Sequence, residues 1–231
     1  MKQSFKVLFH DDGEPIDPRC INRFAYAFPK GYQKVVRNIV EYSEKIGKEA
    51  FVHNVAALMS SFKMTRKGAF HGVKIDKRGI VEDPRNVINT CWSNVGGRLQ
   101  RLRQYLNQNR SGKRGRTLVE ISPDSRIHIV EKTSEIFEEL LETTLSNGEI
   151  SPVAASKVLF AILPEVALPV DTAEWKYVFE TNRYQDVLSI MIKEIEAWEK
   201  RCDNTPLETL DPYPKATLPE VYNIMAMAAR P

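Results

Sequence analysis

The stretch that decides the fold is Leu168-Pro169-Val170-Asp171-Thr172-Ala173-Glu174-Trp175, an apolar run that ends in one aspartate and continues into a helix. Pro169 holds the chain extended, and the side-chain oxygen of Asp171 can cap the helix that follows. Trp175 lies about one turn further along, on the same helix face. The pattern predicts a carboxylate held at a rigid corner, although an aspartate at a helix start is in most cases only a cap.

A short buried helix is predicted just upstream, over residues 155–164, with a single lysine, Lys157, near its start. The order is a lysine-bearing helix, an apolar turn, Val170-Asp171-Thr172 and an aromatic-bearing helix. It resembles the catalytic segment of the helix-hairpin-helix DNA glycosylases, in particular the 8-oxoguanine glycosylase-like branch. The resemblance covers about residues 148–180. It implies a mainly α-helical fold in which two helical subdomains flank a DNA-binding cleft.

The resemblance also implies roles for individual residues. Asp171 matches the aspartate that faces the deoxyribose of a flipped-out nucleotide and stabilises positive charge as the base–sugar bond breaks. Lys157 stands where bifunctional members carry a lysine that forms a Schiff base, but a backbone-contacting or plain surface lysine is an alternative. Ser156 is assigned to the DNA-contacting residues. The function implied is a monofunctional, hydrolytic DNA N-glycosylase without a cofactor.

The chain departs from the family pattern at several positions. The hairpin-like segment Ser146–Pro152 has one glycine, Gly148, and Ala173 stands where a histidine commonly follows the motif. Three scattered cysteines are too few for the iron–sulfur loop of many members; they are Cys20, Cys91 and Cys202. The departures favour an alternative, namely a non-catalytic DNA-binding protein on the same fold.

A concentrated basic segment points independently to nucleic acid. Eight cations and no acid lie between Arg85 and Val119. Residues 1–119 carry 23 basic and 10 acidic residues, whereas residues 120–231 carry 10 basic and 20 acidic ones. This asymmetry predicts that one region of the molecule binds an anionic ligand, and arginine suits bidentate contacts with phosphate. The residues predicted to contact double-stranded DNA are Arg98, Arg101, Arg103, Arg110, Lys113, Arg114 and Arg116.

Helical periodicity runs through most of the chain. A helix is predicted from Pro84 to Leu106, weakened or bent at Gly96-Gly97, and a mobile polar loop over Asn107–Gly115. A glycine-rich loop or small hairpin is predicted over residues 66–83. Further helices are predicted over residues 31–46, 51–59, 127–145, 187–198 and 220–229. The subdomain boundary is placed in residues 107–123, giving an N-terminal subdomain over residues 1–116 and a C-terminal subdomain over residues 117–231, or else one compact domain.

The substrate base cannot be deduced from these residues. Phe160, Trp175 and Lys176 lie near Asp171 in the sequence and are predicted to line the base pocket. An oxidised or alkylated base, or a modified cytosine of the kind some phages carry, would be compatible with the motif. DNA repair and defence against modified phage DNA are therefore both open roles.

One more alternative is a helical ribonuclease that uses an Arg-x4-His dyad, because Arg66 and His71 have that spacing. The glycines around them do not favour the middle of a stable helix. His10, His53 and His128 do not cluster with carboxylates or cysteines at metal-ligand spacing, so no metal site is predicted.

Composition indicates an ordinary globular protein: 231 residues, 42% hydrophobic, with a net charge of +3. No segment reaches the roughly 20 apolar residues that a membrane helix needs, and the N-terminus lacks the apolar core of a signal peptide. Three separate cysteines fit a reducing compartment. The sequence therefore predicts a cytoplasmic monomer with no membrane partner.

Overall fold

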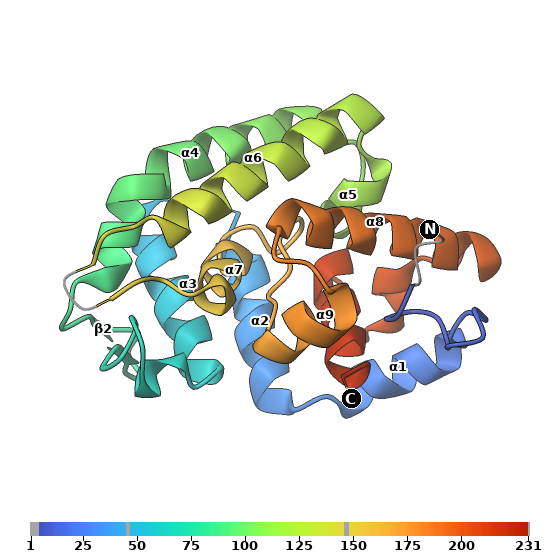
Figure 1. The fold of residues 1–231 in the computed structure, drawn as a ribbon, viewed down its shortest axis with the longest axis horizontal. Coiled ribbons are helices and arrows are strands. Elements are labelled where there is room, and N and C mark those ends of the chain that lie inside the picture. Colours follow the sequence, from blue (N-terminus) through green and yellow to red (C-terminus); the bar gives the residue numbers. More distant parts are fainter. Residues whose placement is uncertain (1–4, 45–46, 146–147, 231) are drawn as a thin grey trace.

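The computed structural model describes residues 5–44, 47–145 and 148–230, and these residues are mainly helical (Figure 1). The α-helices are α1 (Pro18–Ala27), α2 (Lys30–Tyr42), α3 (Lys48–Ser61), α4 (Val87–Asn109), α5 (Thr117–Glu120), α6 (Pro123–Leu141), α7 (Pro152–Phe160), α8 (Tyr184–Arg201) and α9 (Leu218–Ala228). Shorter turns are η1 (Met64–Arg66), η2 (Arg114–Arg116), the π-helical η3 (Glu174–Phe179) and η4 (Leu207–Leu210). The expected mainly α fold is confirmed.

Local sequence explains where several of these helices begin. Ser122 caps α6 and Ser151 caps α7, each accepting a hydrogen bond from a backbone N–H in the first turn. Thr217 and Glu220 form a reciprocal capping box at the start of α9. A proline follows each cap within two residues, where its missing N–H costs nothing and its fixed φ suits the helix.

The small hairpin predicted in residues 66–83 is present as β1 (Lys74–Ile75) and β2 (Val81–Glu82). The two strands are antiparallel, with Lys74 opposite Glu82 and Ile75 opposite Val81. Gly79, in the turn between them, has φ +82°, a left-handed conformation that favours glycine. The hairpin packs against α3.

The expected mobile loop at Asn107–Gly115 is corrected by the structure. Helix α4 continues to Asn109, and Arg114 and Gly115 belong to η2. Gly115 packs so closely on Ala216 that an added Cβ would overlap the Ala216 carbonyl oxygen. Gly96 likewise lies under the ring of Trp92, inside a helix that continues through it. Both glycines thus permit close packing.

A single cluster of buried hydrophobic side chains draws residues from both sides of the predicted boundary. Helices α4 and α6 pack along each other at one edge of the molecule, and α2, α9, η3 and the hairpin lie toward the opposite edge (Figure 1). Between them, α7 and the chain that follows it pass through the interior. None of the helices within the described ranges is long and apolar enough to cross a membrane.

Candidate functional site

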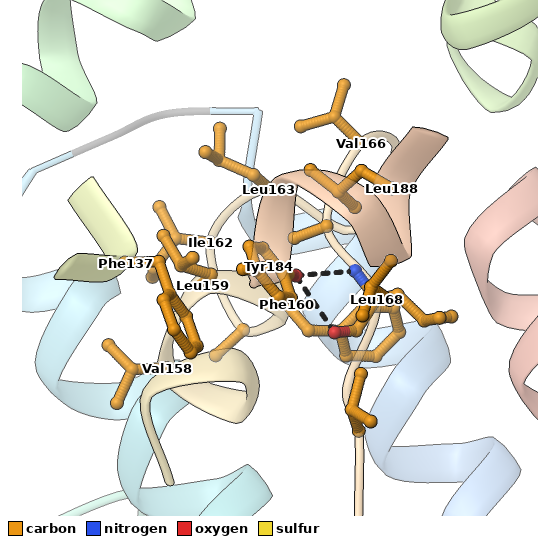
Figure 2. Close-up of a cluster of buried hydrophobic side chains, with 14 of the residues drawn as sticks. Phe137, Val158, Leu159, Phe160, Ile162, Leu163, Val166, Leu168, Tyr184 and Leu188 are labelled. Atoms are coloured by element: carbon orange, nitrogen blue, oxygen red, sulfur yellow. Dashed lines mark hydrogen bonds between the residues drawn. The ribbon is translucent and has the colours of Figure 1, made fainter. Parts of the chain in front are cut away.

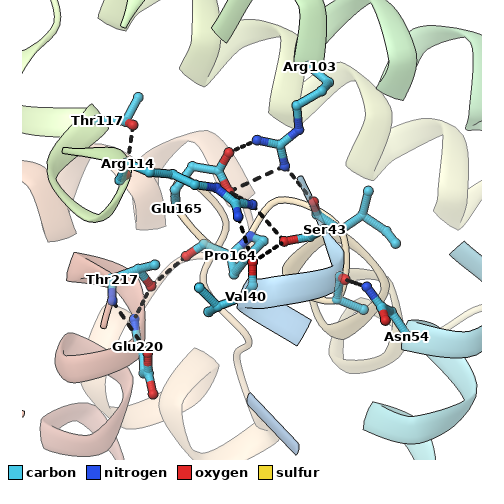
Figure 3. A network of polar contacts seen from close by, with 12 residues as sticks. Val40, Ser43, Asn54, Arg103, Arg114, Thr117, Pro164, Glu165, Thr217 and Glu220 are labelled. Carbon is cyan, nitrogen blue, oxygen red and sulfur yellow. Dashed lines mark hydrogen bonds and ion pairs between the residues drawn. The ribbon is translucent and has the colours of Figure 1, made fainter. Parts of the chain in front are cut away.

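The chain that leads to Asp171 is buried at every residue from Ala161 to Val170, although it forms no regular helix or strand. Buried backbone groups need hydrogen-bond partners, and distant side chains supply them here (Figure 3). Asn54 donates to the carbonyl oxygen of Ala161 at 3.2 Å, Arg103 to that of Ile162 at 2.8 Å, and Thr217 to that of Pro164 at 2.8 Å.

The last residues before Asp171 are held in the same way. The Tyr184 hydroxyl donates to the carbonyl oxygen of Leu168 and accepts from its N–H, both at 2.9 Å (Figure 2). The Ser156 hydroxyl accepts from the N–H of Val170 at 3.0 Å, which ties the turn to α7. Asp171 therefore stands on a backbone that is fixed on both sides, as the rigid corner predicted from its sequence requires.

The Asp171 carboxylate lies between two cations. Lys157 Nζ is 2.5 Å from Oδ1, and Arg230 Nη2 is 2.9 Å from Oδ2. Partial burial acts to raise the pKa of Asp171, but Lys157 and then Arg230 outweigh it and lower the pKa below its ordinary value. The side chain keeps 30% of its surface exposed. The site thus presents an ionised carboxylate that solvent can reach.

The expected role of Asp171 as a side-chain cap is wrong. Its carboxylate oxygens contact Lys157 and Arg230, and its own N–H donates to Glu174 Oε2 at 2.6 Å. The first helical turn is closed by the backbone, with the Trp175 N–H donating to the Asp171 carbonyl oxygen at 3.0 Å. Capping therefore does not explain why a carboxylate occupies this position.

Lys157 is not the surface lysine that was one expectation. Its side chain is 2% exposed, and the ammonium lies 4.1 Å from the centre of the Phe62 ring. Phe62 packs edge-on against Tyr32, with ring centres 5.5 Å apart. The Lys157 side chain therefore passes through the protein interior to Asp171, with the Phe62 ring beside its ammonium group and the Asp171 carboxylate at its end.

Arg230 and Glu174 complete the site, and sequence reasoning missed both. Arg230 Nη2 bridges Asp171 and Glu174, at 2.9 Å and 2.7 Å. Glu174 is buried, and burial raises its pKa although Arg230 and the Asp171 N–H oppose that effect. The spacing of Asp171 and Glu174 was a usable signal, since a glutamate three residues after a helix start commonly reaches back to the backbone. Nothing local identifies Arg230, which lies 59 residues away.

The other residues predicted near Asp171 have mainly structural positions. Phe160 is fully buried in the core, and Ser156 is buried against Val170, so neither faces a ligand-accessible surface. Trp175 packs against Phe137 and Tyr184. Lys176 is exposed and lies over the ring of Tyr177 at 4.8 Å. The expectation that Phe160 lines the base pocket and that Ser156 contacts DNA is corrected by their burial.

Four of the eight cations in the basic segment form ion pairs with acids from elsewhere in the chain. Arg103 is buried and forms a bidentate pair with Glu165, which also binds Arg114 at 3.0 Å (Figure 3). Arg114 further donates to the Val40 carbonyl and the Ser43 hydroxyl, both at 2.6 Å. The terminal nitrogens of both guanidinium groups are engaged by these contacts, so the two groups are not available to phosphate groups, contrary to the expectation.

Arg116 and Arg98 are paired as well. Arg116 contacts Glu120, Glu199 and Glu208 at 2.9, 3.0 and 2.6 Å, and Arg98 contacts Glu139 at 3.0 Å. Arg116 is therefore also removed from the predicted DNA contacts, while Arg98 remains about half exposed. Within the described ranges, three members of the predicted set take part in no ion pair: Arg101, Arg110 and Lys113.

The ribonuclease dyad does not assemble on one helix. Arg66 ends η1, His71 follows it in a turn, and His71 Nδ1 lies 3.2 Å from Arg85 Nη2. No group of three or more His, Cys, Asp or Glu side chains is placed to hold a metal ion in the residues that the structure describes. Cys20, Cys91 and Cys202 are free thiols.

The hairpin-like segment of the resemblance is described incompletely, because Ser146 and Asn147 lie outside the described residues. Gly148 has φ +123°, and Ile150 is buried. No family model matches this chain, and comparisons with curated proteins and with solved structures give no significant match.

Proposed function

We propose that this protein is a DNA glycosylase that hydrolyses the N-glycosidic bond of a flipped-out damaged or modified base, with Asp171 as its catalytic carboxylate. The observation that carries the proposal is the Asp171 site itself. A solvent-accessible carboxylate with a lowered pKa is held on a rigid backbone, beside a lysine that comes from the preceding helix. The local sequence resemblance assigns both residues to the same chemistry.

The chemistry requires a negative charge beside the sugar. As the base leaves C1′ with the bonding electrons, the deoxyribose becomes oxocarbenium-like, and a fixed carboxylate lowers the energy of that state. Water then adds to C1′ and loses a proton to solvent, while the departing base takes up a proton. Because Lys157 and Arg230 lower the pKa of Asp171, its carboxylate is ionised at neutral pH and needs no proton transfer before the reaction.

The Lys157 contact favours hydrolysis over lyase chemistry. A lysine nucleophile needs a free lone pair on Nζ. Here Nζ donates to Asp171 at 2.5 Å, and the Lys157 side chain is almost completely buried. We therefore assign Lys157 the role of positioning the Asp171 carboxylate and keeping it ionised. In the bifunctional alternative a proton passes from Nζ to Asp171, and the amine attacks C1′ and displaces the base, which takes up a proton. The C1′–O4′ bond then breaks, a proton passes from the nitrogen to O4′, and the Schiff base forms.

The test is base release from a panel of duplexes that carry oxidised, alkylated, deaminated and phage-type modified bases. Alkali converts each abasic site into a strand break that is counted on a gel. Asp171→Asn keeps the size of the side chain and removes the charge, so we expect at least about a 100-fold loss of rate. Asp11→Asn, at an exposed position, is the matched control and should leave the rate unchanged.

Each result has a defined meaning. Breaks that need alkali and vanish in Asp171→Asn support the proposal and identify the base. Breaks that form without alkali, and that vanish in Lys157→Met, would assign the lyase reaction to Lys157. Release that persists in Asp171→Asn would overturn the proposed role of Asp171. Thermal unfolding of both variants checks that the loss is not a loss of fold.

A second candidate is a non-catalytic DNA-binding protein. The observation that favours it is that both carboxylate oxygens of Asp171 already contact protein cations, as they would in a purely structural ion pair. This alternative predicts that wild-type protein and Asp171→Asn bind duplex DNA equally and that neither releases a base.

A further inference from the structure

Two stretches of the chain carry cations and no acid. Residues 18–40 and 50–75 contain no Asp or Glu. Seven of their basic side chains are exposed and, within the described residues, take part in no ion pair; Arg19 and Arg23 belong to α1, and the other five lie further along the chain. They are Lys30 and Lys34 at the start of α2, and Lys63, Arg66 and Lys67 after the end of α3; we call these five residues the basic rim.

The basic rim flanks the aromatic pair beside the Lys157–Asp171 site. Phe62, whose ring contacts the Lys157 ammonium, is followed directly by Lys63. Lys63 has φ 58°, and this left-handed residue turns the chain into η1, where Arg66 ends the turn and Lys67 follows. Tyr32, whose ring packs on Phe62, lies between Lys30 and Lys34 in the sequence. Both groups of cations thus belong to the two chain segments that carry these contacting rings.

The engaged arginines lie elsewhere. Arg114 binds the Val40 carbonyl and Ser43, at the C-terminal end of α2. Lys30 begins α2, and a helix of 13 residues is about 20 Å long. The Arg103–Glu165–Arg114 contacts and the basic rim therefore occupy opposite ends of the same helix. Figure 1 shows the N-terminal end of α2 at the edge opposite α4 and α6.

We propose that the basic rim is the surface that binds the phosphates of duplex DNA and brings the duplex to Asp171. This inference rests on the proposed function and names the docking surface of the same site. Cations without carboxylate partners can neutralise phosphates and release the counterions condensed on the duplex, which is the main source of non-specific DNA affinity. The N-terminus of α2, which no side chain caps, adds positive potential between Lys30 and Lys34.

The experiment compares two triple variants with the same change in net charge. The rim variant is Lys63→Gln/Arg66→Gln/Lys67→Gln. The control variant is Arg19→Gln/Lys193→Gln/Lys200→Gln, at exposed positions outside both the predicted DNA-contacting set and the basic rim that take part in no ion pair within the described ranges. Binding of a fluorescent, unmodified 20-base-pair duplex is titrated at several salt concentrations by anisotropy, and base release is measured in parallel.

If three phosphate contacts are lost, the slope of log K against log salt falls by about 2.7. Affinity at 0.1 M salt then falls on the order of 100-fold for the rim variant and less than about threefold for the control. Equal losses in the two variants would show an effect of net charge alone and would overturn the proposal. Unchanged binding in the rim variant would also overturn it.

Base release separates this proposal from the proposed function. A rim variant that binds and releases base like wild type overturns the docking surface and leaves the glycosylase intact. If Asp171→Asn binds duplex DNA through the basic rim and releases base at the same rate as wild type, the glycosylase role of Asp171 is overturned. The basic rim then remains supported as the DNA-binding surface. Wild-type protein that binds no duplex at low salt overturns both.

Discussion

The guanidinium groups of the network around Glu165 and the side chains of the basic rim are all positively charged, but the two sets differ in burial and in ion pairing. Arg103 is buried, Arg114 is largely buried, and the two share one carboxylate, whereas the residues of the rim are exposed and form no ion pair within the described ranges. Both sets come from acid-free stretches of the N-terminal half. The difference teaches that a run of cations identifies a ligand-binding surface only after its intramolecular partners are known.

The energetic consequences of the two environments also differ. A buried ion pair gains Coulomb energy that is offset by the loss of hydration, and removing one partner leaves a charge that nothing compensates. An exposed lysine keeps its hydration, so removing it changes stability little. The network should therefore be needed for folding, and the basic rim for binding.

The largest expected effect is on Glu165. Glu165→Gln removes the only carboxylate that contacts Arg103 and Arg114 in the described residues. Because both guanidinium groups stay buried, we expect the free energy of unfolding to fall by about 4 kcal/mol, measured by urea denaturation. Glu135→Gln is the matched control, since Glu135 forms an exposed pair with Lys132, and it should cost less than about 1 kcal/mol. Similar losses in the two variants would contradict the comparison.

A buried carboxyl group that forms no ion pair should instead make the free energy of unfolding depend on pH. Glu220 is fully buried, forms no ion pair within the described ranges, and has a pKa raised to about 8, by burial and then by Asp211. Its folded pKa exceeds its unfolded value, so its contribution to stability is complete below about pH 4.5 and is lost as pH rises through 8. Wild type should thus lose about 3 kcal/mol more than Glu220→Gln between about pH 5 and pH 7.5.

Urea denaturation across this pH range measures the difference, and the exposed substitution Glu131→Gln serves as the control. Parallel stability curves for wild type and Glu220→Gln would show that Glu220 does not hold its proton in the folded protein.

The smallest expected effect is on the basic rim. Lys63→Gln/Arg66→Gln/Lys67→Gln should change the free energy of unfolding by less than about 1 kcal/mol, because the three side chains are exposed and form no ion pair in the described part of the chain. The same measurement on Arg19→Gln/Lys193→Gln/Lys200→Gln should give a similar value. A loss as large as that of Glu165→Gln would mean that the rim is structural, like the network.

Periodicity and local signals were enough for most of the helical architecture. The long helix over 127–145 corresponds to α6, the glycine-rich stretch contains β1 and β2, and Asp171 lies at a rigid corner as its neighbours predicted. Each of these was indicated by a pattern of neighbouring residues in the sequence. The loop at Asn107–Gly115 was wrong because polar residues and glycines look alike whether they face solvent or pack, as Gly115 does, on a distant carbonyl.

The site was only half predictable for the same reason. Asp171 and Lys157 are 14 residues apart and belong to one local pattern, whereas Arg230 and Phe62 reach the site from distant positions in the chain. Arginine was expected to make bidentate contacts with phosphate, and Arg103 and Arg116 do make bidentate contacts, but with Glu165 and Glu199. A guanidinium group matches the geometry of carboxylate and of phosphate, so the residue type alone did not show which anion it would contact.

The sequence by itself determined the mainly helical fold, the carboxylate at the corner and the separation of positive and negative charge between the two halves, because periodicity, capping and composition are local or additive properties. Only the tertiary structure decided which cations are neutralised. Packing brings Glu165, Glu199 and Glu208 from the acidic half against arginines of the basic half, and leaves the basic rim without an ion pair among the residues that the structure describes. Ion pairs depend on distance in space, which the order of residues along the chain does not specify.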